Sequence, residues 1–367
     1  SDLQKKVYNI LGEGTKKSGS CCSAALIQDP LSGQILAMIS LPSFDPHQVT
    51  PFLTDANSPL LNRAIAGVYP PGSTFKIASS LAGLASGKIS SATQFNDTGE
   101  IFLGSFRFTN WYFTQYGRVE GSVDIIKALK RSNDTFFYLL AQQVGEEGLG
   151  EVAKRVGMGK KLGVDIPGEE AGLIPNDNWK KQNIGEQWFL GDTLHMAIGQ
   201  GYVLTTPLQI NNLISQVAAS GKQYTPFLAL KIINSEDKLI NEFVPKEIKN
   251  QLKEVDWALI RKGLEEVPKT GGTAWPFFAF PIATAGKTGT AEYGDPKNRT
   301  HAWYTGFAPV EDPRVAVTVL VEGGGEGSTV AAPLVKEIMR WYFSEDKNNL
   351  IKDVGPVATE SARTLGE

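Results

Sequence analysis

The chain has 367 residues, of which 41% are hydrophobic and 20% charged, with 38 glycines and 20 prolines. This is the composition of a globular protein long enough for one large domain or two smaller ones. The formal net charge of −3 argues against a basic stripe for nucleic acid, so we expect no nucleic-acid partner.

The two cysteines, Cys21 and Cys22, are adjacent. A bridge between neighbours is strained and two cysteines cannot make a disulfide scaffold, so we interpret them as plain strand residues. No apolar run reaches the roughly 20 residues of a membrane span, and no signal peptide is visible. Because the chain begins with serine rather than methionine, we expect a fragment whose upstream anchor has been removed.

The first elements can be predicted in chain order. Residues 1–20 are polar and lysine-containing and suggest a lead-in. Residues 23–28 and 34–40 read as two strands of a hairpin, since the Asp-Pro-Leu-Ser-Gly stretch between them has turn chemistry. A Pro-Pro-Gly turn then precedes an apolar helix over 73–86.

The middle of the chain is predicted to be mostly helical, with apolar residues at three- and four-residue spacing. These helices are expected at 123–130, 135–144, 207–219 and 257–266. The end returns to strands at 282–293, 301–308 and 314–322, followed by a helix over 329–343 and a polar, mobile tail.

Strands at both ends with helices between them predict an α+β fold. Its centre is a five-stranded antiparallel sheet flanked by helices, with an all-helical subdomain inserted roughly at 88–280. We expect one domain over 21–343 and a separate tail over 344–367.

Ser73 and Lys76 are the first candidate site residues. Ser73 follows the Pro-Pro-Gly turn at a helix start, where free N–H groups favour developing negative charge. Lys76 lies one turn further on the same face, between two apolar residues, and desolvation would lower its pKa. The alternative is a helix cap beside a lysine that reaches solvent.

Ser132 and Asp134 form a second candidate, in a Ser-Asn-Asp stretch before an apolar helix. A helix cap is again the simple alternative. In the functional interpretation, Ser132 relays a proton and Asp134 orients Lys76 or the substrate.

Lys287, Thr288, Gly289 and Thr290 form the third candidate, a Lys-Thr-Gly-Thr stretch in an apolar strand. Glycine lets a substrate backbone approach, and threonine hydroxyls with a lysine charge suit a carboxylate. A similar Lys-Thr-Gly-Gly at 269–272 has loop composition, and we set it aside.

Other kinds of site lack a supporting pattern. The zincin and phosphate-loop motifs are absent, and no Gly-x-Ser-x-Gly supports a serine–histidine triad. We therefore interpret the three histidines, His47, His195 and His301, as structural.

These motifs make the chain resemble the transpeptidase domain of class B penicillin-binding proteins. The motifs are accompanied by further stretches that look like family signatures, at 37–46, 70–76, 163–169, 199–209 and 285–292. Asp134 with the following Thr-Phe-Phe-Tyr is most similar to the elongation-type branch, penicillin-binding protein 2. The resemblance implies the penicillin-binding transpeptidase and serine β-lactamase-like fold.

The branch also implies partners and a location. Members act beside a membrane glycosyltransferase, carry a single membrane anchor and face the periplasm or cell exterior. Some members hold zinc through Asp, His and Cys ligands, but the matching stretch here, 96–120, has Asp97 and no His or Cys. We therefore expect no metal and no cofactor.

The implied activity is peptidoglycan D,D-transpeptidation. Ser73, deprotonated by Lys76, would attack a donor stem peptide, with Ser132, Asp134 and Lys287 handling protons and Thr288 and Thr290 holding a carboxylate. β-Lactams would acylate Ser73. The alternatives are a serine β-lactamase, a β-lactam-sensing receptor domain, or a catalytically silent cell-wall scaffold.

Overall fold

The computed structural model describes residues 1–249, 252 and 255–344. Its centre is one antiparallel sheet with the strand order β11-β12-β13-β1-β2. The strands are β1 (Ser23–Gln28), β2 (Ile35–Leu41), β11 (Ala285–Glu292), β12 (Thr300–Ala308) and β13 (Val315–Val321). The first and last strands of the sequence meet where β1 pairs with β13, which confirms the predicted five-stranded sheet.

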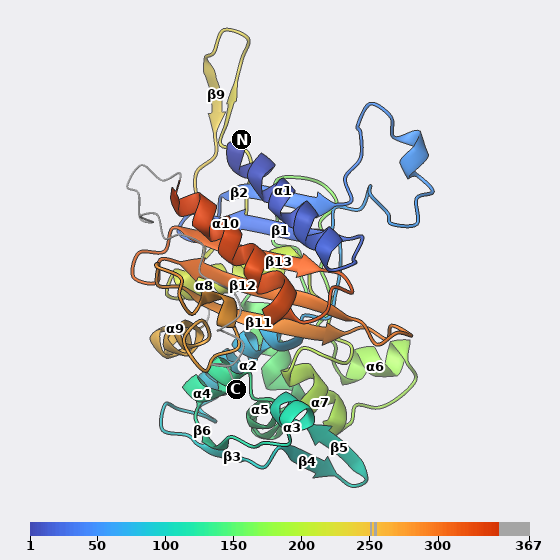
Figure 1. Ribbon diagram of the computed structural model, residues 1–367, viewed down its shortest axis with the longest axis vertical. Helices are drawn as coiled ribbons and strands as arrows, with labels where there is room; N and C mark the ends of the chain where they lie inside the picture. The colour runs from blue at the N-terminus through green and yellow to red at the C-terminus, as the bar shows by residue number, and fades with distance from the viewer. Residues whose placement is uncertain (250–251, 253–254, 345–367) are drawn as a thin grey trace.

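Two helices from opposite ends of the sequence cover one face of the sheet, α1 (Asp2–Lys17) and α10 (Ala332–Ser344), as Figure 1 shows. Val7 and Leu11 of α1 are fully buried against the sheet. The predicted lead-in is therefore a packed helix. Its polar composition hid apolar residues at helical spacing, which are enough to bury one face.

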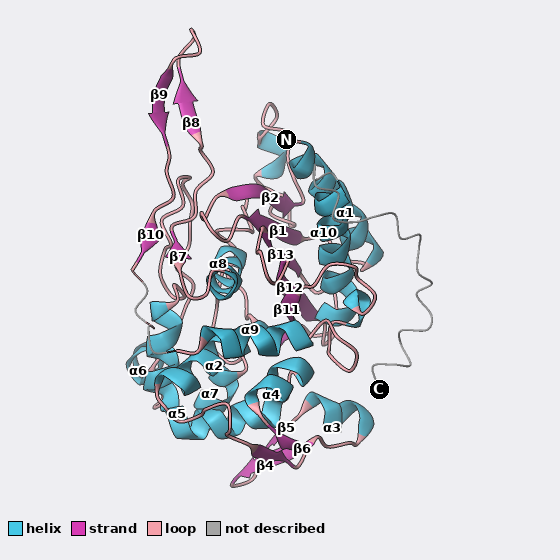
Figure 2. Ribbon diagram, turned by 90° about the vertical axis from the view of Figure 1, so that its left-hand side faces the viewer, coloured by secondary structure: helices cyan, strands magenta, loops and turns pink. Residues whose placement is uncertain are grey.

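The other face of the sheet is covered by α8 (Pro207–Ala218), as Figure 2 shows. All residues of this helix are buried. Thr206 and Gln209 form a capping box at its start. Below the sheet lies a group of helices that carries most of the remaining core. They are α2 (Lys76–Ala85), α4 (Ile125–Arg131), α5 (Asp134–Arg155), α7 (Leu190–Ala197) and α9 (Trp257–Glu266). The shorter helices α3 (Trp111–Tyr116) and α6 (Asp177–Asn183) lie on the same side but add no residue to this core.

The insertion is not all-helical, which corrects the prediction. Its described residues form four two-stranded antiparallel sheets, β3–β6, β4–β5, β7–β10 and β8–β9. Their strands are β3 (Phe95–Asp97), β4 (Glu100–Leu103), β5 (Phe106–Thr109), β6 (Gly121–Val123), β7 (Gln223–Tyr224), β8 (Lys231–Ile233), β9 (Leu239–Glu242) and β10 (Glu247–Ile248). They are two to four residues long, too short for an alternating pattern to distinguish them from loops.

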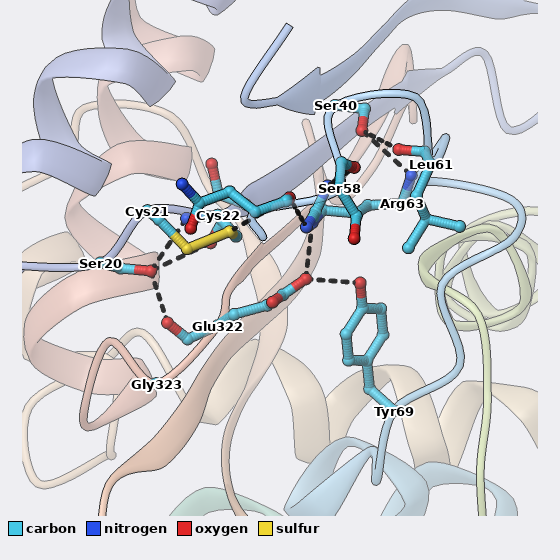
Figure 3. A network of polar contacts seen from close by, with 12 residues as sticks. Ser20, Cys21, Cys22, Ser40, Ser58, Leu61, Arg63, Tyr69, Glu322 and Gly323 are labelled. Atoms are coloured by element: carbon cyan, nitrogen blue, oxygen red, sulfur yellow. Dashed lines mark hydrogen bonds and ion pairs between the residues drawn. A yellow bond between two sulfur atoms is a disulfide. The ribbon is translucent and has the colours of Figure 1, made fainter. Parts of the chain in front are cut away.

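Cys21 and Cys22 are joined by a disulfide, contrary to the prediction. They lie before β1, which begins at Ser23, so strand geometry does not separate their sulfur atoms. Ser20 accepts a hydrogen bond from the Cys22 backbone at 3.1 Å and donates to the Glu322 carbonyl (Figure 3). The disulfide thus lies beside the end of β13.

The Glu322 side chain gathers contacts from distant segments. Its carboxylate accepts from Arg63 Nε and from the Tyr69 hydroxyl, each at 2.7 Å (Figure 3). Arg63 also donates to the carbonyls of Asn57 and Ser58. This network fixes the chain four residues before Ser73.

None of the helices in the described residues is long and apolar enough to cross a bilayer. Ser344, the first residue of the predicted tail over 344–367, is the last residue of α10, and residues 345–367 lie outside the described residues.

Candidate functional site

Ser73 lies in a short 3-10 helix, Gly72–Phe75, that leads directly into α2. Glycines make this turn possible. Gly72 has a φ of +52°, and a Cβ there would lie 2.7 Å from the carbonyl oxygen of Thr290. Gly199 has a φ of +71°, and a Cβ there would lie 2.2 Å from the Gly72 carbonyl oxygen. Only glycine permits the turn, strand β11 and the 199 loop to approach this closely.

Lys76 is the first residue of α2 and is fully buried. Its Nζ donates to Asp134 Oδ1 at 2.6 Å and to Ser132, at 2.7 Å to the carbonyl oxygen and 3.2 Å to Oγ. Three polar contacts therefore hold the amine of Lys76, a residue that follows Ser73 by one helical turn.

Ser132 and Asp134 are placed by a tight turn between two helices. Ser132 ends α4 with a φ of +53°, an uncommon conformation for a residue with a side chain. Asn133 then caps α5 by accepting from the Phe136 backbone at 2.8 Å. Asp134 opens α5, where the N-terminal dipole favours its charge. The helix cap is thus made by Asn133, which leaves the side chains of Ser132 and Asp134 on either side of it to contact Lys76.

Lys287 lies on β11 and is also fully buried. Its Nζ donates to the Thr288 carbonyl oxygen at 3.1 Å. Desolvation lowers the pKa of Lys287 well below its ordinary value, and the charge of Lys76 adds to this decrease. Desolvation likewise lowers the pKa of Lys76, against the opposing attraction of Asp134. The two amines are close enough to affect each other while sharing one carboxylate.

The two threonines of β11 already have hydrogen-bond partners. The Thr288 hydroxyl pairs with the Thr273 hydroxyl at 2.7 Å. The exposed Thr290 accepts at Oγ1 from the Gly327 backbone at 3.2 Å. A hydroxyl is one donor and two acceptors. Thr290 therefore keeps its proton, and the Thr273–Thr288 pair keeps one, for a further acceptor.

Gly289 faces the serine turn. A Cβ at this position would lie 2.9 Å from Thr74 Cγ2 and 3.1 Å from the Pro71 carbonyl oxygen. Together with the contact between Gly72 and Thr290, this packing places β11 directly beside Ser73. The structure thus brings all three predicted motifs to one junction, formed by the Ser73 turn, the α4–α5 turn and β11.

Several residues at this junction escaped prediction. Asn110 accepts at Oδ1 from the Asp134 backbone at 3.1 Å, and the Trp111 backbone donates to Asp134 Oδ2 at 3.0 Å. Neither stands in a recognisable pattern. Thr273, in contrast, directly follows the 269–272 stretch that was set aside because of its loop composition. The similarity between the 269–272 loop and the Lys-Thr-Gly-Thr stretch at 287–290 could have drawn attention to Thr273.

Among the residues that the structure describes, no group of three or more His, Cys, Asp or Glu side chains gathers as metal ligands. Asp97, singled out in the sequence for its place in the stretch 96–120, is 2% exposed and accepts hydrogen bonds from amide groups.

The family model of the penicillin binding protein transpeptidase domain matches residues 23–340. The chain belongs to this family. The predicted resemblance and fold class are confirmed, since solved members share the mixed architecture.

The chain is about one third identical to several members of this family. Peptidoglycan D,D-transpeptidase MrdA of Salmonella typhimurium strain SL1344 is 32% identical over 366 residues, which cover 91% of this chain and 57% of the relative. The chain thus spans little more than half of that relative. The crystal structure of Pseudomonas aeruginosa PBP2 in complex with WCK 5153 is 33% identical with a TM-score of 0.80, covering 95% of this chain and 77% of that one.

A third relative was solved as a complex. PBP2 of Helicobacter pylori, bound to MreC, is 32% identical with a TM-score of 0.75, covering 90% of this chain and 62% of that chain.

Proposed function

We propose that this chain is the catalytic domain of a peptidoglycan D,D-transpeptidase that works through an acyl-enzyme on Ser73. One observation carries the proposal: the buried Lys76 amine, one turn from Ser73, is held by both Ser132 and Asp134. A serine nucleophile needs a base within reach and a group that orients the base. The names of its relatives supply the substrate class.

In the first half-reaction, neutral Lys76 takes the hydroxyl proton of Ser73. Ser73 Oγ then attacks the carbonyl carbon of the penultimate D-Ala in a donor stem peptide. The backbone N–H groups of Ser73 and Thr290 stabilise the oxyanion, a contribution of about 10²–10³ in rate for each donor. Ser132 passes a proton to the amine of the terminal D-Ala, and the peptide bond breaks to leave an ester on Ser73.

In the second half-reaction, an amine from another stem peptide attacks this ester. The ester bond breaks, the new amide cross-link forms, and the proton of the amine returns to Ser73 through Lys76. β-Lactams enter the same first step, and their ring-opened ester remains on Ser73.

The carboxylate of the terminal D-Ala would lie against β11. Thr290 and the Thr273–Thr288 pair each retain a hydroxyl proton that can be donated to it. The positive charge of Lys287 would attract the carboxylate when the lysine is protonated and would assist Ser132 in proton transfer.

We further propose that the domain faces the periplasm or cell exterior as part of a membrane-anchored protein that works beside a membrane glycosyltransferase. The family resemblance supports this proposal.

A fluorescent penicillin tests the proposal. The protein should form a stable covalent adduct that maps to Ser73 by mass spectrometry, and Ser73→Ala should form none. Ser235→Ala, which alters an exposed Ser-x-x-Lys elsewhere, is the matched control and should label normally. Rapid drug hydrolysis would instead identify a β-lactamase, and no adduct at all would identify a scaffold.

A further inference from the structure

A buried carboxylate outside the three motifs lies next to the α4–α5 turn. Asp97, the last residue of β3, is 2% exposed. Its Oδ1 accepts from the Gly99 backbone at 2.9 Å. Its Oδ2 accepts from the side-chain amides of Asn110 and Asn133, at 3.0 and 2.8 Å, and from the Glu120 backbone at 2.9 Å.

These donors are all uncharged amides. The ion pairs recorded for the described part of the chain include none with Asp97. Burying a carboxylate is costly unless its oxygens are satisfied, and hydrogen bonds to a charged acceptor are roughly twice as strong as neutral ones. A carboxylate is therefore well suited to this point, because three donors converge on one oxygen atom.

The two side-chain amides connect Asp97 to the proposed catalytic residues. Because Asp97 holds the NH₂ groups, the carbonyl oxygens of both amides point the other way. The Asn133 oxygen accepts from the Phe136 backbone and so caps α5. The Asn110 oxygen accepts from the Asp134 backbone.

The last link is Asp134 itself. With its backbone held by Asn110 and its Oδ2 held by the Trp111 backbone, Asp134 presents Oδ1 to Lys76 Nζ at 2.6 Å. Each step from Asp97 to Lys76 is a hydrogen bond between buried groups. If either amide turned over, exchanging its oxygen and NH₂ positions, its NH₂ group would meet a backbone N–H and the hydrogen bond would be lost.

We propose that Asp97 is a positioning residue for acyl transfer, which sets the orientation of Asn133 and Asn110 and through them the place of Asp134 beside Lys76. This inference rests on the proposed function. Asp97 touches no reacting atom, so its loss should slow the acylation step while leaving the noncovalent affinity for the β-lactam unchanged.

The test measures the acylation rate at saturating fluorescent penicillin, together with the dissociation constant that precedes acylation. Asp97→Ala should lower the rate by about 10²-fold, the cost of a small misplacement of a catalytic group. Asp97→Asn should lower the rate less, because the amide carbonyl oxygen can accept from the three convergent donors. Only the hydrogen bond from the Gly99 backbone is lost, since the NH₂ group cannot accept it.

The chain offers a matched control. Glu169 is also a buried carboxylate, 6% exposed, and accepts from three backbone N–H groups, those of Leu162, Gly163 and Val164. It lies next to a different core cluster. Glu169→Ala should lower the melting temperature but leave the acylation rate of the folded protein at the parent value.

The outcomes separate the inference from the proposed function. A parent protein that forms no adduct refutes the function. A parent that labels while folded Asp97→Ala acylates at the parent rate refutes the positioning role, and so does a Glu169→Ala variant that is slowed equally. Should Asp97→Ala not fold, Asp97→Asn decides: a slowed rate supports the role, and a parent rate overturns it.

Discussion

At the scale of single residues, the defining feature is two buried lysines beside one carboxylate. Lys76 and Lys287 are both fully buried, and Asp134 is the anion that they share. Burial disfavours the charged form of each amine, and proximity disfavours charging both. The site therefore favours a neutral amine at a pH where an exposed lysine is protonated.

This property predicts the pH dependence of acylation. The acylation rate should rise with pH as Lys76 loses its proton. This rising limb of the pH–rate profile should lie below the ordinary lysine pKa, because desolvation lowers the pKa of Lys76. Attraction to Asp134 opposes that decrease, so Asp134→Asn should lower the pKa further and move the limb to lower pH. Stopped-flow labelling across pH measures both profiles.

The reference variant for this prediction is Lys76→Ala. It should fold but lose about 10²–10⁴ in acylation rate together with the limb, since general-base catalysis has this size. Lys180→Ala, which removes another buried lysine paired with a carboxylate, should keep the parent limb. A Lys76→Ala variant with near-parent acylation would exclude Lys76 as the base.

At the scale of elements, glycines determine how closely the Ser73 turn approaches its neighbours. Gly199→Ala should destabilise the protein and also slow acylation, because the new Cβ would lie 2.2 Å from the Gly72 carbonyl oxygen and displace the turn. The strain of a positive φ alone is about 1–3 kcal/mol. Chemical unfolding and penicillin labelling measure the two effects.

Gly87→Ala separates strain from contact. Gly87 has a φ of +66°, but a Cβ there would meet nothing within 4 Å. It should therefore lose stability without slowing the acylation of folded protein. If the acylation rate fell equally in Gly87→Ala and Gly199→Ala, general destabilisation of the fold, rather than displacement of the Ser73 turn, would account for the slower acylation.

The elements also show how far the sequence reaches. Strong patterns gave correct results: the strand at 23–28 and the helix at 257–266 match β1 and α9 residue for residue. The α1 helix was missed because its lysines outweighed Val7 and Leu11, although their spacing was a usable signal. Long hydrophobic patterns report burial, whereas short strands depend on partners far along the chain.

The candidate site divides in the same way. Ser73, Lys76, Ser132 and Lys287 carry reactive groups at recognisable spacings, so the sequence predicts them as site residues, and the fold brings their motifs to one junction. Asn110, Thr273 and the bonds of Asp97 were not foreseen, because they depend on which loops meet in space. The disulfide between the adjacent cysteines was not foreseen either, because it depends on the backbone conformation of residues that precede β1.

At the scale of the whole molecule, His301 links several elements. It lies on β12, accepts at Nδ1 from the Gly323 backbone at 3.1 Å, and stacks on Tyr293 at 4.0 Å. Its ring also meets the edge of Tyr69. Desolvation lowers the pKa of His301 to about 4.

Global stability should therefore fall in acid. Between the ordinary histidine pKa of about 6.5 and about 4, the unfolded chain binds a proton that the folded chain does not. The free energy of unfolding then decreases as pH falls, by up to about 1.4 kcal/mol per unit for one proton. Urea unfolding at several pH values should show a smaller slope for His301→Gln.

His47→Gln is the control, because His47 lies exposed on the surface. It should leave the slope as in the parent. Part of the slope will remain in His301→Gln, since desolvation also lowers the pKa of His195. An unchanged slope in His301→Gln would mean that other groups account for the acid sensitivity.

The position of β11 at the border of the sheet has a consequence for how copies of the protein behave together. A border strand offers free backbone groups to any extended chain and so invites edge-to-edge association. Here α9 and the Ser73 turn pack against β11. Figure 1 shows α9 next to this strand. A single extended peptide is much narrower than the edge of a second folded sheet. The elements packed against β11 should therefore exclude a second sheet while still admitting one peptide. Concentrated solutions should stay free of fibrils seeded at this strand, even though the proposed function places a donor peptide against it.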